Sequence, residues 1–364
     1  MSHATPERGC ALLTIYFNRT YATNAQLIAM LRANPDGRPV RVIATHVDAD
    51  SPVLAASDLA LPEPGPGVRG EDYLRWALAF TAEHRVDVFV PRLELAALAA
   101  GRQRFAEQGV ALLAPPSPAV DLFENKAAAY ADAAGRGLPV PPYRQVTDGA
   151  SLLAAFDEIS AQTGGACLKP VTGVGGDGFR LLTTDRLCLA DVLGPLSATV
   201  NVHAVADALD AAIEQAGPIA PLLVLPVLPG PEVSVDVLAD PAGKPLVAIG
   251  RAKHGRRRRI VDDPAARGIA ETLVQAHQLS YLSNTQVRYW QGPGDQRARP
   301  YLLEVNTRIS GGLFQTSLTG LNLPWAAVRL ALGEEVDLAE PRYDIVYVTP
   351  PGLAVVGPAR HGGL

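Results

Sequence analysis

Short apolar stretches alternate with helical stretches through the first 113 residues, and this alternation restricts the fold more than any other feature of the chain. Four stretches rich in β-branched or aromatic residues have the length of buried strands, at residues 11–17, 40–46, 86–90 and 111–113. Helical patterns fall between them, at residues 24–33, 73–84 and 94–108. Strands in such an order run parallel, because each helix carries the chain back across the sheet. The sequence therefore predicts an α/β fold that begins with a doubly wound parallel sheet. No Gly-x-Gly-x-x-Gly follows the first strand, so a dinucleotide site is not expected there.

Composition excludes several other classes of protein. Of the 364 residues, 48% are hydrophobic and only 19% charged, which is typical of compact chains with two or three domains. A net charge of −5 argues against a nucleic-acid binder. No apolar stretch reaches the roughly 20 residues of a membrane span, and the polar start lacks the apolar core of a signal peptide. Three scattered cysteines are too few for a disulfide framework. We therefore expect a cytoplasmic protein without membrane partners.

Proline-rich stretches divide the rest of the chain. Residues 114–118 are expected to be a linker, since consecutive prolines stop helices. Further helices are predicted over residues 126–134, 151–162, 265–278 and 323–332. Strands are predicted over residues 166–170, 178–182, 222–227, 232–239, 246–251, 285–290 and 301–305. These patterns predict three domains, at residues 1–114, 115–225 and 226–364.

A glycine-rich stretch after a lysine-bearing strand is the first candidate site. Lys169 lies at the end of the strand, and Gly173, Gly175 and Gly176 follow it. Glycines let backbone N–H groups approach phosphate oxygens, and a lysine adds a positive charge beside them. The lysine precedes the glycines, so this is not a P-loop. A glycine-rich hairpin turn is the alternative interpretation.

The second candidate lies on the strand at residues 301–305 and the residues after it. Glu304 and Asn306 are two residues apart, so their side chains point to one face. Carboxylate and amide oxygens suit Mg²⁺ held together with nucleotide phosphates, and Gln286 on a neighbouring strand could supply a third oxygen. Arg308 could stabilise charge on a transferring phosphoryl group. The alternative is a solvated strand face followed by a helix-capping turn.

The third candidate is an apolar stretch followed by an acid. Leu225, Pro226, Val227 and Leu228 are apolar enough to enclose a flat ring, and Glu232 could accept hydrogen bonds from sugar hydroxyls. Two strands joined by a Pro-Gly turn are the alternative.

In this order the motifs, preceded by Lys126, resemble the ATP-grasp superfamily, in the form of carboxylate–amine ligases with an ATP-binding domain like that of carbamoyl-phosphate synthetase. The resemblance covers residues 114–332. It implies a two-lobed α+β ATP-grasp fold after the N-terminal domain, ATP as a substrate and Mg²⁺ (two ions) as cofactor. It also implies that Lys126 and Lys169 contact phosphate, that residues 172–178 form a mobile loop, and that residues 225–228 read adenine through main-chain groups.

The resemblance assigns further roles residue by residue. Glu232 matches the ribose-binding acid, Arg308 the arginine beside the transferring phosphate, and the metal ligands are Gln286, Glu304 and Asn306. Two departures stand out. Leu225 and Pro226 replace a common acidic residue, which leaves preference for ATP over GTP open, and glutamine at 286 lowers the negative charge of the metal site.

Other charged or small residues are candidates for substrate contact. Arg251 and Lys253 precede an unusual basic stretch at residues 256–259, which either recognises an anionic substrate or is a solvated loop. Arg251 is expected to be catalytic together with Lys169 and Arg308. Ser310, Gly311 and Gly312 follow the metal strand, and Arg92 and Glu94 follow a strand of the first domain.

The chain is therefore expected to be an ATP- and Mg²⁺-dependent ligase that forms an acylphosphate and couples it to an amine, with small-molecule substrates and a possible homodimer. A small-molecule kinase and a non-catalytic nucleotide-binding regulator are the alternatives. A narrower likeness to ATP-grasp proteins of tellurium-resistance gene clusters comes from residues 15–24 and 90–94.

Overall fold

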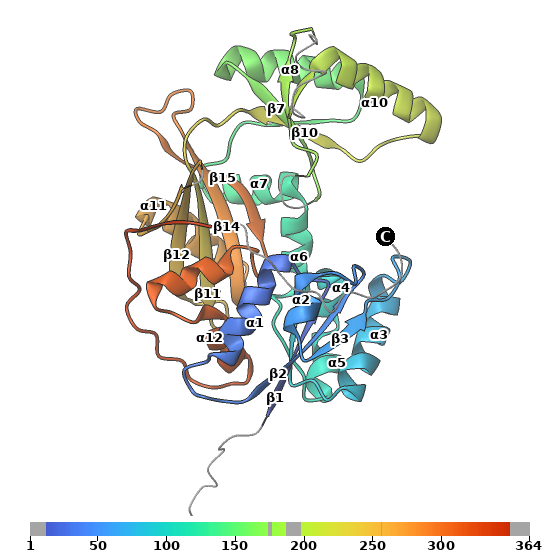
Figure 1. Cartoon of the computed structure of the whole chain (residues 1–364). Coiled ribbons are helices and arrows are strands. Elements are labelled where there is room, and N and C mark those ends of the chain that lie inside the picture. The colour runs from blue at the N-terminus through green and yellow to red at the C-terminus, as the bar shows by residue number, and fades with distance from the viewer. Residues whose placement is uncertain (1–11, 174–176, 187–197, 256, 350–364) are drawn as a thin grey trace, which may run out of the picture. The chain divides into compact units, whose positions relative to one another are not determined.

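The computed structural model describes residues 12–173, 177–186, 198–255 and 257–349. The chain divides into two compact units (Figure 1). The first unit combines Met1–Asp121, Val233–Thr285 and Val305–Leu364, and the second combines Leu122–Glu232 and Gln286–Glu304. The three domain boundaries predicted from the sequence follow a different criterion and stay a prediction.

A five-stranded parallel sheet opens the first unit. Its order is β3-β2-β1-β4-β5. The strands are β1 (Leu13–Asn18), β2 (Val40–His46), β3 (Leu59–Pro62), β4 (Val88–Val90) and β5 (Ala111–Leu112). Its helices are α1 (Ala25–Arg32), α2 (Pro52–Ala56), α3 (Gly70–Glu83), α4 (Leu95–Ala100) and α5 (Arg102–Glu107), and the short helix η1 (Ala22–Asn24) precedes α1. Side chains alternate along β1, so that Ile15 packs against α1 whereas Tyr16 packs against α3. Helices thus cover both faces, and the predicted doubly wound sheet is confirmed.

Two predicted elements of this region were wrong. The single helix expected over residues 94–108 is two helices, α4 and α5, separated at Gly101. A Cβ atom at Gly101 would lie 2.5 Å from Leu74 Cδ1, so the close approach of α3 explains the glycine. The expected linker at residues 114–118 contains the start of α6 (Ser117–Glu124). Pro118 lies in the first turn of α6, where a helix tolerates proline.

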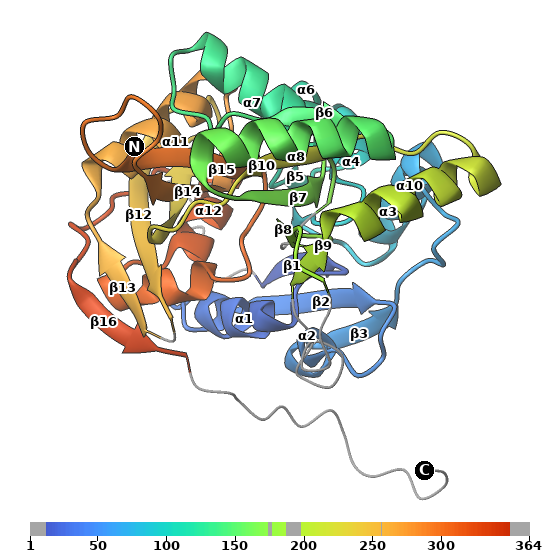
Figure 2. The same cartoon turned by 90° about the horizontal axis from the view of Figure 1, so that it is seen from above.

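The second unit contains a sheet of order β6-β10-β7-β8-β9. The strands are β6 (Arg144–Val146), β7 (Ala166–Pro170), β8 (Arg180–Thr183), β9 (Thr199–Asn201) and β10 (Leu222–Pro226). Helices α8 (Gly149–Thr163) and α10 (Val202–Ala216) lie side by side, as Figure 2 shows, and their apolar residues share a core with the sheet. Helix α7 (Lys126–Gly135) precedes this sheet in the chain.

A six-stranded sheet of order β15-β14-β11-β12-β13-β16 completes the fold. The strands are β11 (Glu232–Ala239), β12 (Pro245–His254), β13 (Arg257–Val261), β14 (Tyr281–Trp290), β15 (Arg299–Asn306) and β16 (Ile345–Val348), with helices α11 (Pro264–Ala276), η2 (Leu313–Thr319) and α12 (Leu323–Ala331). The boundary between the units falls within β14 and β15. Within the part of the chain that the structure describes, no helix combines the length and the apolar character that crossing a membrane requires.

The basic stretch at residues 256–259 is not the loop that one interpretation expected. Arg257, Arg258 and Arg259 belong to β13, which pairs antiparallel with β12 on one side and with β16 on the other. Arg256 lies outside the described residues. Hydrogen bonds to two neighbouring strands hold β13 extended, although three of its five residues are arginines.

One of the core clusters of the first unit joins residues from both ends of the chain. Ile15 and Leu27 from the N-terminal sheet and α1 belong to the same buried cluster as Leu313 and Trp325 near the C-terminus. Polar contacts reinforce this junction, and Trp325 Nε1 donates to Asp36 Oδ2 at 2.7 Å.

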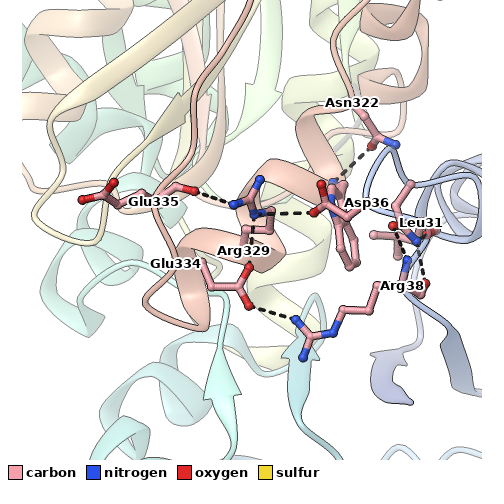
Figure 3. A network of polar contacts seen from close by, with 9 residues as sticks. Leu31, Asp36, Arg38, Asn322, Arg329, Glu334 and Glu335 are labelled. Atoms are coloured by element: carbon pink, nitrogen blue, oxygen red, sulfur yellow. Dashed lines mark hydrogen bonds and ion pairs between the residues drawn. The ribbon is translucent and has the colours of Figure 1, made fainter. Parts of the chain in front are cut away.

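A network of ion pairs lies beside this core (Figure 3). Arg329 lies 3.1 Å from Glu334 and 3.6 Å from Asp36, and its Nη2 donates to the Glu335 carbonyl at 2.8 Å. Arg38 pairs with Glu334 at 2.8 Å. The segment after α12 is therefore fastened to the loop between α1 and β2.

Candidate functional site

The first lysine of the predicted phosphate site, Lys126, is the first residue of α7. Asn125 caps this helix, since its side chain accepts from the Ala128 N–H at 3.0 Å. The Lys126 N–H donates to Val171 O at 2.9 Å, and its ammonium group donates to Gly173 O at 2.7 Å. The lysine thus reaches the start of the glycine-rich stretch. Gly173 has a φ of 114°, a conformation that favours glycine, whereas Gly175 and Gly176 lie outside the described residues.

The second lysine, Lys169, lies on β7 and contacts only neutral oxygens within hydrogen-bond distance among the described residues. Its Nζ donates to the Tyr130 hydroxyl at 2.8 Å and to Leu303 O at 3.4 Å. Tyr130 lies one helical turn after Lys126 on α7, and its own hydroxyl donates to Leu303 O at 2.7 Å. The two lysines, Tyr130 and the end of β15 therefore form one cluster in the second unit, which we call the lysine cluster.

Burial shifts the pKa values of the lysine cluster. It lowers the pKa of Lys169 below its ordinary value of 10.5, against the opposing effects of Cys167 and Glu304. It also lowers the pKa of Lys126, where the Glu304 carboxylate opposes the shift and the Lys169 charge adds to it. Burial raises the pKa of the Tyr130 hydroxyl well above its usual range, and Glu304 adds to that shift. Glu304 is thus close enough to influence all three groups, and its charge favours the protonated form of each lysine.

The predicted metal ligands lie on neighbouring strands. Gln286 is on β14 and Glu304 on β15, both in the second unit, and Asn306 follows Glu304 by two residues on β15. All three are half-buried. In the described ranges, no group of three or more His, Cys, Asp and Glu side chains is arranged to hold a metal ion. The set offers one carboxylate and two amide oxygens, so it suits a hard cation that also takes oxygens from phosphate.

The predicted adenine-binding stretch begins at the end of β10. Leu225 and Pro226 pair with Cys167 and Ala166 of β7, and Leu225 is buried. Leu228 packs against Trp290 and Tyr301. The Val227 N–H already donates to Gly165 O at 3.2 Å, so this donor is engaged within the protein. Glu232, the predicted ribose ligand, is the half-buried first residue of β11.

Arg251 lies at the centre of a second, buried cluster in the first unit. Its Nε donates to Asp236 Oδ2 at 2.5 Å, and its two terminal nitrogens lie 3.2 Å from Gln315 Oε1 and from Ser310 Oγ. The second Asp236 oxygen accepts from Asn284 at 2.9 Å and from Ser310 at 2.8 Å. We call these residues the Arg251 cluster.

The Arg251 cluster is tightly packed. A Cβ atom at Gly312 would lie 2.3 Å from Arg251 Nη1, so only glycine leaves room for the guanidinium. Although burial lowers the pKa of Arg251, the adjacent Asp236 carboxylate outweighs it and raises the pKa overall. The ion pair gives Arg251 a structural role, and its expected catalytic role stays a prediction. Lys253, two residues further along β12, is half-buried and lies opposite Arg258 of β13.

The remaining candidates lie after strands β1, β4 and β15 in the first unit. Arg92 and Arg308 both contact one aromatic ring, because their Cζ atoms lie 4.0 Å and 5.0 Å from the Tyr21 ring centroid. A Cβ atom at Gly311 would lie 3.2 Å from Thr23 Oγ1 and 3.6 Å from the Tyr21 ring. Glu94 has a positive φ of 54°, and its carboxylate accepts from the Gly70 N–H at the start of α3 at 2.9 Å. Glu94 therefore has a structural partner.

Sequence reasoning missed three residues of these clusters. Tyr130 follows Lys126 by four positions on a predicted helix, so helical spacing alone could have placed it on the same face. Asp236 lies between Val235 and Val237, and a carboxylate between apolar residues of a strand is a sign of a buried partner. Tyr21 carried no comparable signal, because its partners Arg92 and Arg308 are far away in the sequence.

Comparison with known proteins identifies the fold. Residues 219–350 match the model of a family described as ATP-grasp in the biosynthetic pathway with Ter operon. This match agrees with the narrower likeness noted from the sequence, although it covers other residues than those that suggested it. A search of curated proteins found no match to the chain.

Solved structures resemble the chain over most of its length. An ADP complex of N5-carboxyaminoimidazole ribonucleotide synthetase has a TM-score of 0.62 at 18% identity and covers 93% of this chain and 81% of its own. The biotin carboxylase domain of Hydrogenobacter thermophilus 2-oxoglutarate carboxylase, a dimer with MgADP, ADP and bicarbonate, has a TM-score of 0.61 at 16% identity, covering 92% and 73%. Biotin carboxylase from Campylobacter jejuni, in a β-γ-ATP complex, has a TM-score of 0.61 at 16% identity, covering 89% and 72%. With a doubly wound sheet followed by two further sheets, the chain has the fold of the ATP-grasp superfamily.

Proposed function

We propose that this chain is an ATP- and Mg²⁺-dependent ligase that activates a substrate carboxylate and couples it to an amine. The lysine cluster carries the proposal. The ammonium groups of the buried Lys126 and the half-buried Lys169 are held by the Gly173 and Leu303 carbonyls and the Tyr130 hydroxyl, and a carboxylate follows Leu303 directly. Cations held by neutral oxygens keep their charge for an incoming anion, and phosphate is the anion that two adjacent lysines suit.

The reaction has two steps, phosphoryl transfer to the carboxylate and attack of the amine on the acylphosphate. A carboxylate oxygen of the substrate attacks the γ-phosphorus of ATP, and ADP leaves with the electron pair of the broken P–O bond. The amine then attacks the carbonyl carbon of the acylphosphate, inorganic phosphate leaves, and the amine loses a proton. Such transfers depend on positioning and charge neutralisation more than on a covalent side chain. Lys126 and Lys169 would supply the positive charge.

Gln286, Glu304 and Asn306 would hold Mg²⁺. Their oxygen donors fit the ion, and a set with one carboxylate leaves positive charge for the phosphate oxygens of ATP. The ion would neutralise charge on those oxygens. The solved structures of similar fold include complexes with ADP, with MgADP and with a β-γ-ATP ligand, which supports nucleotide binding. A cytoplasmic location, small-molecule substrates and a homodimer are further parts of the proposal.

Substitution Glu304→Gln tests the proposal, because it keeps the size of the side chain and removes its charge. Isothermal titration of ATP with and without Mg²⁺ should show a Mg²⁺-dependent gain in affinity for the wild type that is lost in Glu304→Gln. The matched control is Glu214→Gln, on the exposed side of α10 in the same unit. An unchanged Mg²⁺ dependence in Glu304→Gln would remove Glu304 from the site.

A second assay identifies the reaction. ADP and phosphate release would be followed over pools of carboxylic acids and amines. Release of both, with a new amide mass only when two substrates are present, is the expected result. ADP release with a stable phosphorylated product would contradict the ligase and indicate a kinase.

A further inference from the structure

The site of this inference lies where the order of the N-terminal sheet reverses. The order β3-β2-β1-β4-β5 places β1 and β4 next to each other, and the chain leaves them in opposite directions. In open α/β sheets the carboxyl ends of two such strands are where ligands bind. Tyr21 follows the end of β1 and Arg92 follows the end of β4.

The loop that carries Arg92 is fixed by Asn18, the last residue of β1. The Asn18 side-chain oxygen accepts from the Arg92 N–H at 2.7 Å and from the Leu93 N–H at 3.3 Å. Its amide nitrogen donates to Leu93 O and to the Tyr73 hydroxyl, both at 2.9 Å. The Tyr73 hydroxyl in turn donates to the buried Glu63 carboxylate. A buried polar network therefore holds the loop before any ligand arrives.

The charge of Arg92 has no carboxylate partner in the part of the chain that the structure describes. No carboxylate among the described residues forms an ion pair with it, and its guanidinium donates only through Nη1, to Arg19 O at 3.1 Å. Its Nε is buried without a hydrogen-bond partner in the described part of the chain. A buried donor without a partner costs free energy, which a ligand that accepts from it would recover.

A second guanidinium, that of Arg308, lies over the same ring. An aromatic face attracts a cation within about 6 Å of its centroid, and both Cζ atoms satisfy this. Two like charges held by one ring also repel each other, and an anion between them would remove that repulsion. Guanidinium groups pair best with planar carboxylates, through two parallel hydrogen bonds.

We propose that Tyr21 is a positioning residue of the carboxylate-substrate site, whose ring holds Arg92 and Arg308 as a receptor for a carboxylate-bearing substrate. The inference rests on the proposed function, because it assigns the acid substrate of that reaction to this place. It adds Tyr21 to the site, assigns binding of the acid to Arg92, and makes a substrate with two carboxylates the best match for two guanidiniums.

Equilibrium dialysis with radiolabelled malonate at constant ionic strength tests the proposal without knowledge of the natural substrate. The wild type should bind malonate in a saturable manner, and more tightly than acetate. Arg92→Ala and Tyr21→Leu should each weaken malonate binding at least tenfold. Tyr21→Phe, which keeps the ring, should restore the affinity that Tyr21→Leu loses. Arg75→Ala, which removes an exposed arginine of α3, is the control and should bind as the wild type does.

Three results would overturn the inference. They are absence of saturable binding to the wild type, equal affinity in Tyr21→Leu and the wild type, and loss of binding in Lys169→Met but not in Arg92→Ala. Thermal unfolding of each variant shows whether it is folded. Titration of the wild type with ATP and Mg²⁺ separates the two proposals. Nucleotide binding without malonate binding would reject only this inference, and malonate binding that depends on Arg92 without nucleotide binding would reject only the proposed ligase.

Discussion

The lysine cluster and the Arg251 cluster both bury positive charge, but they compensate it differently. Lys126 and Lys169 donate to carbonyl and phenol oxygens, and the nearest carboxylate, Glu304, acts on them electrostatically. Arg251 instead donates directly to the fully buried Asp236 at 2.5 Å. Burial therefore lowers the pKa of both lysines, whereas the adjacent carboxylate raises the pKa of Arg251. The contrast separates a cluster suited to an incoming anion from one that already contains its anion.

The largest effect is expected from breaking the ion pair of the Arg251 cluster. Asp236→Ala leaves a buried guanidinium without its partner and should lower the free energy of unfolding by about 3–5 kcal/mol. Asp344→Ala removes the partner of Arg259, and both of these side chains are more than half exposed, so the cost should stay below about 1 kcal/mol. Urea denaturation of the two variants measures the difference. Equal losses would show that the Arg251 cluster contributes no more than a surface pair.

Lys169→Met, in contrast to Asp236→Ala, should weaken ATP binding without destabilising the fold. It removes a charge that the fold buries at a cost, so we expect the free energy of unfolding to be unchanged or higher. Affinity for ATP should fall at least a hundredfold, which corresponds to about 2.7 kcal/mol. Calorimetric titration and urea denaturation of the same preparation measure both quantities. Wild-type affinity in a folded Lys169→Met protein would exclude Lys169 from phosphate binding.

The pH dependence of stability and of ATP affinity should also reflect the two lysines, with a smaller effect than the Lys169→Met substitution. Because the pKa of each buried lysine lies below 10.5, the native state loses these protons at lower pH than the unfolded state. The unfolded state then binds more protons in that range, so the contribution of the lysines to the free energy of unfolding rises with pH. ATP affinity should fall over the same range, as the lysines lose their charge. In Lys169→Met both changes should be smaller. An ATP affinity that stays constant up to pH 10.5 would contradict the assignment.

The sequence predicted best those elements whose own residues determine them. Strands β7 and β11 have the predicted bounds, because each is a short stretch rich in apolar residues that begins directly after a glycine or proline. Strand β13 was missed, since its arginines are held extended by β12 and β16, which no local pattern reveals. Helix α10 (Val202–Ala216) was also missed, in a region that looked irregular.

The residues of the candidate site differ in the same way, since some were predicted from the sequence and their distant partners were not. The resemblance to the ATP-grasp superfamily selected Lys126, Lys169 and Glu304, and in the structure Lys169 donates to Leu303 of β15 while Glu304 influences the pKa of both lysines. It also selected Arg251 without Asp236, and Arg308 without Tyr21. These partners are brought together by packing between segments that are distant in the sequence, so no local pattern of residues predicts them.

The core cluster that joins both ends of the chain in the first unit has a consequence for synthesis on the ribosome. Leu27 and Leu31 of α1 are covered in the finished protein by residues that include Trp325, which is translated about 300 residues later. At a synthesis rate of roughly 5–20 residues per second, the apolar face of α1 stays uncovered for on the order of 15–60 s until Trp325 has been made. Residues 122–232 of the second unit, by contrast, emerge as one uninterrupted segment that already contains all five strands of its sheet. The face of the N-terminal sheet that α1 covers, although made first, is thus completed late, and its apolar residues are exposed to aggregation during that interval.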